Sequence, residues 1–181
     1  MGTITITPAQ IGDAEAIAAV HVASWEATYR GLVPAAVLAG MTLERRTAQW
    51  CARLASVDGD RFIRVARRLD GEIVGVVQAG PARTVGDFAD SELDVLYVLD
   101  RYHGSGVGRR LMAAAIEQAR SQGARTLGLW VVVGNARARA FYEKAGAVFA
   151  AERTDGDGAE RMVEHGLRID LATGGDGGTP A

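Results

Sequence analysis

Apolar and polar residues alternate at the start of the chain and then recur at helical spacing. Residues 3–7 alternate threonine with isoleucine, which is the pattern of a strand with one buried face. From Asp13 to about Arg30 the apolar positions recur every three to five residues, so we expect an amphipathic helix with Asp13 as its cap. A second helical region is predicted from about residue 35 to residue 56, with a break near Gly40.

Two turns that contain Asp-Gly separate β-rich runs later in the chain. The first turn lies between residues 62–69 and 72–79, and the second lies between residues 147–153 and 160–170. An Asp-Gly pair between two such runs is the strongest short-range signal of a β-hairpin. Each pair of runs is therefore predicted to be antiparallel.

The middle of the chain has the pattern of two buried strands, each followed by a helix. Residues 92–99 are mostly apolar, as in a central strand, and a glycine-rich turn at 104–108 opens a helix that ends near Gln122. A second buried strand is predicted over 127–133, and Asn135 is placed to cap the next helix. This crossover makes the two strands parallel neighbours.

The elements follow the order β-α-α-β-β-β-α-β-α-β-β. Because the order combines hairpins with one crossover, it predicts an α/β (α+β) fold, with a mixed, mostly antiparallel sheet of about seven strands and helices on both faces. The chain of 181 residues has the length of one domain, which we place at residues 1–171. The glycine-rich tail, residues 172–181, is expected to be disordered.

Composition and charge exclude several classes of partner. Hydrophobic residues are 48% and charged residues 23% of the chain, which is ordinary globular composition. The net charge of −2 leaves no excess of positive charge for nucleic acid, and no apolar run approaches the roughly 18 residues of a membrane span. Cys51 is the only cysteine, so no intrachain disulfide and no cysteine-based zinc site can form. We expect a cytoplasmic protein without nucleic acid or membrane partners.

Gly104, Gly106 and Gly108 stand between a predicted strand and a predicted helix. Glycines at this place let backbone N–H groups converge beside a helix N-terminus, where a phosphate binds, although they also serve as a plain packing turn. A P-loop would need lysine and then serine or threonine after the last glycine, but two arginines follow it. A dinucleotide-binding fingerprint needs the spacing Gly-x-Gly-x-x-Gly and an acidic residue at the end of the next strand. The evenly spaced glycines and residues 127–133 provide neither.

Two sequence motifs, in order, resemble those of the GCN5-related N-acetyltransferase (GNAT) superfamily. The pattern Arg-x-x-Gly-x-Gly at residues 101–106 resembles motif A of that superfamily, Arg/Gln-x-x-Gly-x-Gly/Ala. Residues 135–147, in which an asparagine opens a helix that ends in Phe-Tyr-x-x-x-Gly, resemble motif B. Residues 21–34 look like the opening helix of many bacterial members, and the likeness covers about residues 3–171.

The resemblance implies an acyltransferase that moves an acetyl group from acetyl-CoA to a primary amine of a small molecule or a peptide by direct attack. It implies that coenzyme A lies in a V-shaped gap where two parallel strands, residues 92–99 and 127–133, splay apart. A bulge in the first strand would aim an N–H at the thioester carbonyl, where negative charge develops. The residues that the resemblance places around the cofactor are Leu96, Tyr97, Val98, Arg101, Tyr102, His103, Gly104, Ser105, Gly106, Val107, Gly108 and Asn135.

The resemblance also suggests roles for two side chains in the reaction. Tyr142 would be the general acid that protonates the departing thiolate, because a phenol with a pKa near 10 keeps its proton at neutral pH. An amine arrives largely as ammonium, so a base must take its proton, and Glu92 is the residue that we choose. Asp94, which shares the strand face of Glu92, Glu26 and a chain of water molecules are the alternatives.

Some residues have two interpretations that the sequence leaves open. Trp25 and Tyr29 either line the acceptor pocket, as their region does in the family, or form an aromatic core stripe at helical spacing. Asn135 contacts the cofactor, caps its helix, or does both. The three histidines have no metal-ligand spacing, so no metal is implied.

Other functions are kept as alternatives. A module that binds coenzyme A as a sensor, without turnover, would carry the same glycine loop, and a nucleotide-binding enzyme would prefer ATP. Neither the acceptor amine, nor whether the acyl group is always acetyl, nor the oligomeric state follows from the sequence. Pairing into a homodimer through a sheet edge or the C-terminal hairpin is common among similar proteins and is left open.

Overall fold

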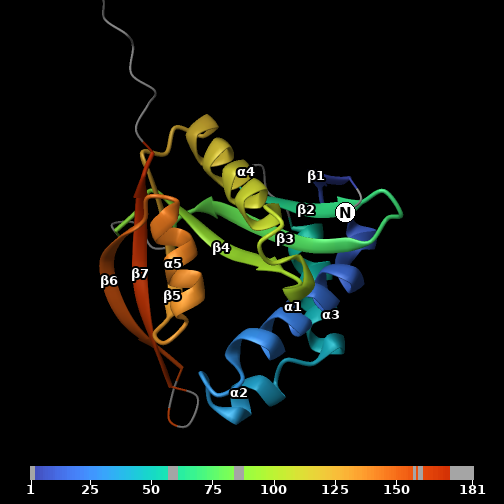
Figure 1. Ribbon diagram of the computed structural model, residues 1–181, viewed down its shortest axis with the longest axis horizontal. Coiled ribbons are helices and arrows are strands. Elements are labelled where there is room, and N and C mark those ends of the chain that lie inside the picture. Colours follow the sequence, from blue (N-terminus) through green and yellow to red (C-terminus); the bar gives the residue numbers. More distant parts are fainter. Residues whose placement is uncertain (1–2, 57–60, 84–87, 157, 159–160, 172–181) are drawn as a thin grey trace, which may run out of the picture.

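One seven-stranded sheet organises the chain in the computed structural model, which describes residues 3–56, 61–83, 88–156, 158 and 161–171 (Figure 1). The strand order is β1-β2-β3-β4-β5-β7-β6, and every neighbouring pair is antiparallel except β4 and β5. The predicted mixed, mostly antiparallel sheet is confirmed. The strands are β1 (Ile4–Pro8), β2 (Phe62–Arg68), β3 (Ile73–Pro81), β4 (Ser91–Val98), β5 (Thr126–Val132), β6 (Val148–Asp155) and β7 (Met162–Asp170).

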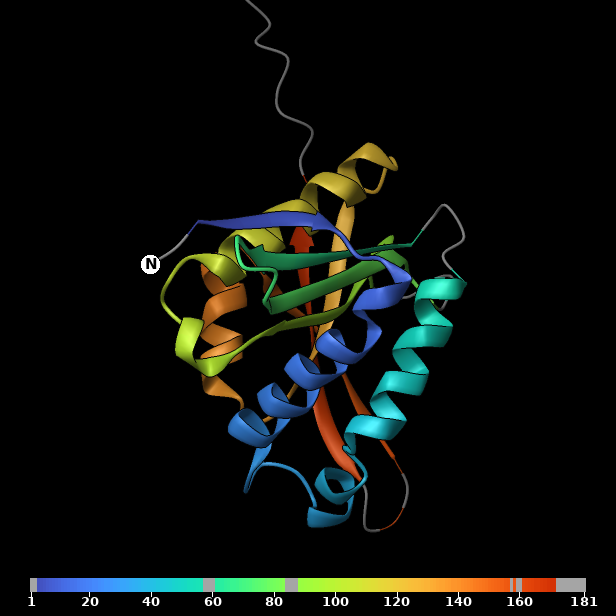
Figure 2. The same cartoon turned by 90° about the vertical axis from the view of Figure 1, so that its right-hand side faces the viewer.

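Helices cover both faces of the sheet, and each face has its own core (Figures 1 and 2). Helices α1 and α3 pack on one face, around Ile17, Trp50 and Val65, which are almost fully buried. Helix α4 packs on the other face, where Leu111 lies within the larger core. The helices are α1 (Ala14–Tyr29), α2 (Ala35–Ala39), α3 (Leu43–Ala55), α4 (Val107–Ser121) and α5 (Ala136–Lys144), with short 3₁₀ turns at Ile11–Asp13 and Asp100–Tyr102.

Side-chain caps explain where two of the helices begin. Thr42 accepts a hydrogen bond from the backbone N–H of Arg45 and so starts α3, which confirms the break predicted near Gly40. Asn135 accepts a bond of 3.1 Å from the N–H of Ala138 at the start of α5. The capping role predicted for Asn135 is therefore confirmed. Asp13 makes no such cap for α1; its carboxylate instead accepts from the backbone N–H of Gln10.

The two parallel strands pair over a short length and then separate. Residues Ser91–Leu93 of β4 pair with Leu127–Leu129 of β5, and no pairing continues beyond them. A register shift between β3 and β4 leaves Asp94 without a partner at this point, which is the geometry of a β-bulge. The two strands therefore diverge and leave an opening in the sheet.

Some expectations lie outside the described residues or are not tested by the structure. The tail predicted to be disordered, residues 172–181, is outside the described part of the chain. That residues 1–171 form one domain stays a prediction. Within the described residues, none of the helices combines the length and apolar character that crossing a membrane requires.

His21 is a titratable group buried in the core between α1 and α3, with 5% of its surface exposed. The indole N–H of Trp50 donates to its Nδ1 over 3.2 Å, so the ring is neutral and carries its proton on Nε2. Burial, followed by the charges of Arg46 and Arg53, lowers the pKa of His21 from 6.5 to about 3. The folded state therefore resists a proton that the unfolded chain accepts below about pH 6.5.

We expect the contribution of neutral His21 to the free energy of unfolding to be fully present above about pH 6.5 and to decrease as the pH falls toward 3. His21 alone should remove about 2 kcal/mol between pH 6.5 and pH 5. Urea denaturation at the two pH values tests this with His21→Gln, which keeps an acceptor for Trp50 and should lose this part of the difference. His165→Gln, on the sheet surface, is the matched control, and an unchanged difference in His21→Gln would contradict the assignment.

Candidate functional site

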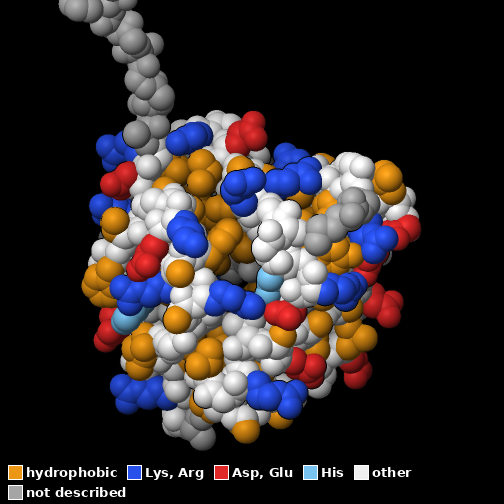
Figure 3. Space-filling view, in the orientation of Figure 1, with side chains coloured by type: hydrophobic (Ala, Val, Ile, Leu, Met, Phe, Trp, Pro, Cys, Tyr) orange, Lys and Arg blue, Asp and Glu red, His pale blue; other side chains and the backbone are white. Residues whose placement is uncertain are grey.

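A pocket of about 920 Å³ opens where β4 and β5 separate. Leu96, Tyr97 and Val98 of β4 form one side, and Trp130 and Val131 of β5 form the other. Because the strands no longer pair with each other here, the backbone groups of β4 that face β5 have no strand partner. Figure 3 shows the hollow near the middle of one face of the molecule, with basic side chains beside it.

The glycine loop closes one end of the pocket. Gly104 and Gly106 have φ values of +76° and +88°, a left-handed conformation that favours glycine, and Gly106 is the N-cap of α4. No side chain caps this helix, so the N–H groups of its first turn point at the pocket without a partner in the helix. Free amide groups and the positive end of the helix dipole together form a site for a phosphate or pyrophosphate.

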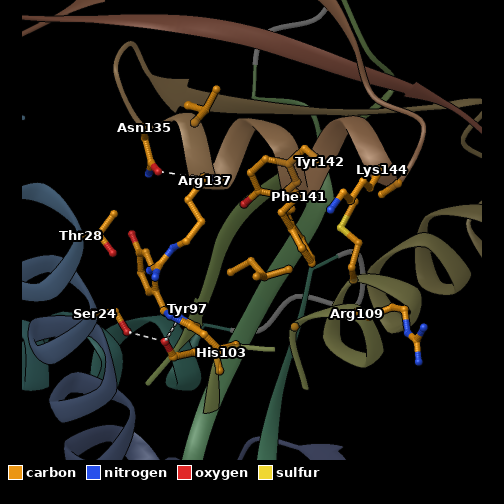
Figure 4. A pocket seen from close by; sticks show the side chains of 18 of the residues that line it. Ser24, Thr28, Tyr97, His103, Arg109, Asn135, Arg137, Phe141, Tyr142 and Lys144 are labelled. Atoms are coloured by element: carbon orange, nitrogen blue, oxygen red, sulfur yellow. Dashed lines mark hydrogen bonds between the residues drawn. The ribbon is translucent and has the colours of Figure 1, made fainter. Parts of the chain in front are cut away.

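Three basic side chains line the pocket. Arg109 comes from α4, and Arg137 and Lys144 come from α5 (Figure 4). Arg137 lies 3.3 Å from Asp100, whereas no carboxylate lies within ion-pair distance of Arg109 or Lys144 in the described residues. The pocket is therefore suited to a ligand with several negative charges.

Tyr142 lines the pocket from α5, and its hydroxyl points inward (Figure 4). The ring packs edge-on against Phe141, with 5.2 Å between the ring centres. Burial, with smaller contributions from Tyr29 and Tyr97, raises the pKa of the Tyr142 phenol well above its ordinary value near 10. The phenol is therefore protonated at neutral pH and can donate its proton, although its role as general acid stays a prediction.

The structure does not bring Glu92 to this pocket. Glu92 faces a separate small recess beside Phe88 and Trp130, and its carboxylate accepts a weak bond of 3.4 Å from the backbone N–H of Arg83. Regular strand alternation would place Glu92 on the same face of β4 as Leu96. The bulge between the two residues shifts the alternation, so Glu92 no longer faces the same way as Leu96. Glu26 is exposed and does not line the pocket either.

Asp94 lines the pocket, but both of its oxygens are engaged. Oδ2 lies 2.5 Å from Nη1 of Arg61, and Oδ1 lies 2.9 Å from Nη2 of Arg83. The Asp94 side chain is only 3% exposed. Because a proton on Asp94 would break an ion pair in a buried place, this carboxylate is poorly suited to act as a base.

The two aromatic residues of α1 have different positions. Tyr29 lines the pocket, and burial raises the pKa of its phenol above the ordinary value. Trp25 does not line the pocket; it packs against Tyr29 at 4.5 Å between ring centres, and its N–H donates to the Tyr97 hydroxyl over 2.8 Å. Tyr29 therefore lines the pocket, and its contact with the acceptor stays a prediction, whereas Trp25 lies outside the lining and bonds to Tyr97.

Two residues predicted at the cofactor do not line the pocket. Arg101 forms an ion pair with Glu72, and its guanidinium lies 5.2 Å from the ring centre of Tyr102. Val107 is a buried core residue, so only its backbone at the start of α4 faces the loop. The other predicted cofactor residues that line the pocket are Leu96, Tyr97, Val98, Tyr102, His103, Gly104, Ser105, Gly106, Gly108 and Asn135.

His103 has a structural position at the pocket wall. Its Nε2 lies 2.9 Å from the carbonyl oxygen of Val98, and its Nδ1 lies 2.9 Å from Asp100. Ser24 of α1 donates to the same carbonyl over 3.4 Å. These bonds fix the end of β4 at the point where the glycine loop begins. The described residues contain no group of histidine, cysteine, aspartate or glutamate that could hold a metal ion.

Sequence reasoning missed several lining residues. Arg137, Phe141 and Lys144 lie three and four residues apart on α5, so helical spacing already places them on one face. That face could have been identified from Tyr142 and the capping Asn135. Trp130 gave no comparable signal, because its contact with the pocket follows from the separation of the strands.

Comparisons with known proteins give a consistent result. Residues 25–147 match the model of the acetyltransferase (GNAT) family. An uncharacterized N-acetyltransferase of Bacillus subtilis, YuaI, is 30% identical over 168 residues, which are 91% of each chain. Among solved structures, the ribosomal-protein-alanine N-acetyltransferase of Brucella melitensis is 28% identical with a TM-score of 0.70, and covers 92% of this chain and 99% of its own.

A second solved structure is informative about the fold. The PaiA N-acetyltransferase of Thermoplasma acidophilum was solved in complex with coenzyme A. It is similar with a TM-score of 0.69 over 93% of this chain and 99% of its own, at 21% identity. At this identity the likeness concerns the fold, including the arrangement of strands and helices around the pocket.

Proposed function

The chain belongs to the acetyltransferase (GNAT) family, and on that basis we propose that it transfers an acetyl group from acetyl-CoA to a primary amine of a small molecule or a peptide. The observation that carries the proposal is the pocket between β4 and β5, which joins an uncapped glycine-rich helix start to a protonated, inward-pointing Tyr142. A phosphate site and a proton donor in one opening of the sheet are what a thioester of coenzyme A requires.

The residues present fit coenzyme A. The first-turn N–H groups of α4 would hold the pyrophosphate, and Arg109 and Lys144 would balance the remaining negative charge. The edge of β4 that β5 leaves unpaired, near Leu96 and Tyr97, offers backbone groups to the amide-containing arm, whereas the Val98 carbonyl already accepts from Ser24. Acetyl-CoA supplies the activated acetyl group, and the chain supplies its position.

Tyr142 would protonate the sulfur of the leaving thiolate. Its phenol keeps its proton because burial disfavours the phenolate, and the strong hydrogen bond to a developing thiolate is made only as the carbon–sulfur bond breaks. A bulge N–H near Asp94 would stabilise the oxygen of the attacked carbonyl. Tyr29 lies on the α1 side of the same pocket, where the acceptor would approach.

Glu92 remains the hypothesis that the sequence offers for the base, and its position gives it no direct contact with the pocket. Asp94 is held by two arginines, and Glu26 is exposed outside the pocket. We therefore propose that the acceptor ammonium gives its proton to water before the neutral amine attacks. The pH dependence of kcat/KM should then follow the pKa of the acceptor amine rather than that of a carboxylate.

Calorimetric titration with acetyl-CoA, with ATP and NAD as controls at the same salt, tests the cofactor assignment. We expect acetyl-CoA alone to bind, and Gly106→Ala to weaken its Kd about tenfold, because a side chain at φ +88° strains the loop that aims the N–H groups. Gly123→Ala at the other end of α4, with φ +81°, introduces similar strain and should leave the Kd unchanged. Equal losses in both variants, or binding of ATP instead, would contradict the assignment.

Tyr142→Phe should lower kcat by about 10²–10⁴ without weakening the binding of acetyl-CoA. Because burial raises the pKa of Tyr142, the ratio of wild-type to variant kcat should stay constant between about pH 6 and pH 9. Tyr29→Phe, which also removes a pocket hydroxyl, should change KM for the acceptor more than kcat. If Tyr142→Phe binds acetyl-CoA and turns over as the wild type does, the acid role is wrong.

If the wild type binds acetyl-CoA and acetylates no amine, the chain is a sensor of coenzyme A.

Glu92→Gln is expected to keep kcat/KM within about threefold of the wild type, since the proton goes to water. The rise of kcat/KM with pH should be the same in both proteins and should move with the pKa of the acceptor used. A loss of about 10² or more, together with disappearance of the acid limb of the pH profile, would support Glu92 as the base instead.

A further inference from the structure

His103 lies at the pocket wall with an oxygen atom beside each nitrogen of its ring. Its Nε2 lies 2.9 Å from the carbonyl oxygen of Val98, the last residue of β4, and Ser24 donates to the same oxygen (Figure 4). Its Nδ1 lies 2.9 Å from Oδ1 of Asp100. Both distances are those of hydrogen bonds. The ring therefore joins the end of β4 to the 3₁₀ turn that follows it.

Neither of these two oxygens can donate a hydrogen bond. A carbonyl oxygen only accepts, and so does the oxygen of an ionised carboxylate. The hydrogen bond from Arg137, followed by the charge of His103, lowers the pKa of the Asp100 carboxyl group, which is therefore ionised at neutral pH. Both ring nitrogens have to carry a proton for both bonds to exist, and a ring with two protons is an imidazolium.

A neutral His103 ring keeps only one of the two bonds. With its proton on Nε2, it turns the lone pair of Nδ1 toward the Asp100 carboxylate. With its proton on Nδ1, it turns the lone pair of Nε2 toward the Val98 carbonyl. Loss of the second proton thus breaks one bond in either tautomer. Histidine is the side chain whose charge ordinarily changes between about pH 5 and pH 8.

The charged groups around His103 come from the 3₁₀ turn, α4 and α5. Asp100 stabilises a positive ring, whereas Arg137 of α5, which lies 3.3 Å from the same Asp100 oxygen, opposes it. The other arginine of the pocket, on α4, and its lysine, on α5, act in the same sense as Arg137. Arg101 pairs with Glu72. At the ring bond itself, β4 contributes a neutral carbonyl and α1 a neutral hydroxyl.

His103 also immediately precedes the glycine loop. Its backbone N–H donates to the Asp100 carbonyl over 2.9 Å, so the chain turns sharply before the loop. Gly104 and Gly106 follow with left-handed φ values of +76° and +88°, and α4 begins directly after them. The two ring bonds therefore fix, relative to β4, the segment that leads to the free N–H groups at the start of α4.

We propose that His103 positions the glycine loop as an imidazolium, and that the chain binds acetyl-CoA more tightly when this ring carries its second proton. The imidazolium keeps both ring bonds, so the loop is ordered before the phosphates arrive. Its positive charge also lies in the wall of the pocket. The gain in affinity is present at low pH and is lost as the pH rises and the ring becomes neutral. This inference rests on the proposed use of acetyl-CoA.

Calorimetric titration of the full chain with acetyl-CoA at about pH 6.5 and about pH 8.5 tests the inference. A phosphate monoester of the ligand also titrates near pH 6, so each variant is compared with the wild type at the same pH and salt. His103→Gln keeps one N–H donor but takes up no proton. We expect it to bind about tenfold more weakly than the wild type at the lower pH, as for one lost charge-assisted bond, and equally at the higher pH.

His103→Arg is the variant that keeps the charge at both pH values. Relative to the wild type, it should bind equally at the lower pH and more tightly at the higher pH. His165→Gln is the matched control, because His165 lies 3.3 Å from Glu152 and does not line the pocket. It should follow the wild type at both pH values. His21, with a pKa lowered to about 3, stays neutral throughout this range.

Two further measurements report on the proton itself. Titration near pH 7.5 in two buffers of different ionisation enthalpy should show that the wild type takes up more protons with acetyl-CoA than His103→Gln does. The ring resonances of His103, assigned in NMR spectra with His103→Arg, give the pH midpoint of its titration. Acetyl-CoA should raise this midpoint by about one pH unit, which corresponds to a tenfold difference in affinity. Asp100→Asn should lower the midpoint, because it removes the carboxylate that stabilises the charge.

The outcomes separate failure of this inference from failure of the proposed function. If acetyl-CoA binds at neither pH, both are wrong. If it binds and the ratio of the Kd of His103→Gln to that of the wild type is the same at both pH values, with equal proton uptake, the inference alone is overturned. A midpoint that acetyl-CoA leaves unchanged or lowers would also overturn it. If thermal melting shows that His103→Gln is unfolded, His103→Arg and the NMR titration of the wild type decide.

Discussion

β4 and β5 pair over only three residue pairs, Ser91–Leu93 with Leu127–Leu129, and then separate. A parallel pair that stops early leaves backbone groups without partners inside the sheet, a state that costs free energy unless a ligand or water satisfies them. The bulge at Asp94 and the bonds of Ser24 and His103 to the Val98 carbonyl fix both ends of the open segment. The pocket, the glycine loop and Tyr142 all take their positions from this separation.

The two ends of the opening differ in how their charges are paired. At one end, uncapped N–H groups of α4 and the cations of α4 and α5 suit the phosphates of coenzyme A. At the other end, Arg61 and Arg83 pair with Asp94. Half-buried Tyr142, which keeps its proton at neutral pH, lies in the same pocket. The site suited to phosphate and the proton donor therefore lie in one opening of the sheet.

The motif residues were not equally informative about the site. Gly104, Gly106 and Tyr142 line the pocket, because the backbone conformation and helix position on which they depend are local. Arg101 instead pairs with Glu72, and Glu92 faces another recess, because strand pairing and the bulge decide where these side chains lie. A match to a motif therefore predicts the backbone more reliably than the destination of a long charged side chain.

The sequence by itself determined the order of strands and helices, the break near Gly40, the helix start at Asn135, and the glycine loop before α4. These features depend on periodicity, capping and backbone preference, which act between residues close in the chain. Only the tertiary structure decided that β4 and β5 part after three pairs and that Asp94 is engaged by two arginines. Those outcomes depend on packing and electrostatics between segments far apart in sequence, which no local pattern contains.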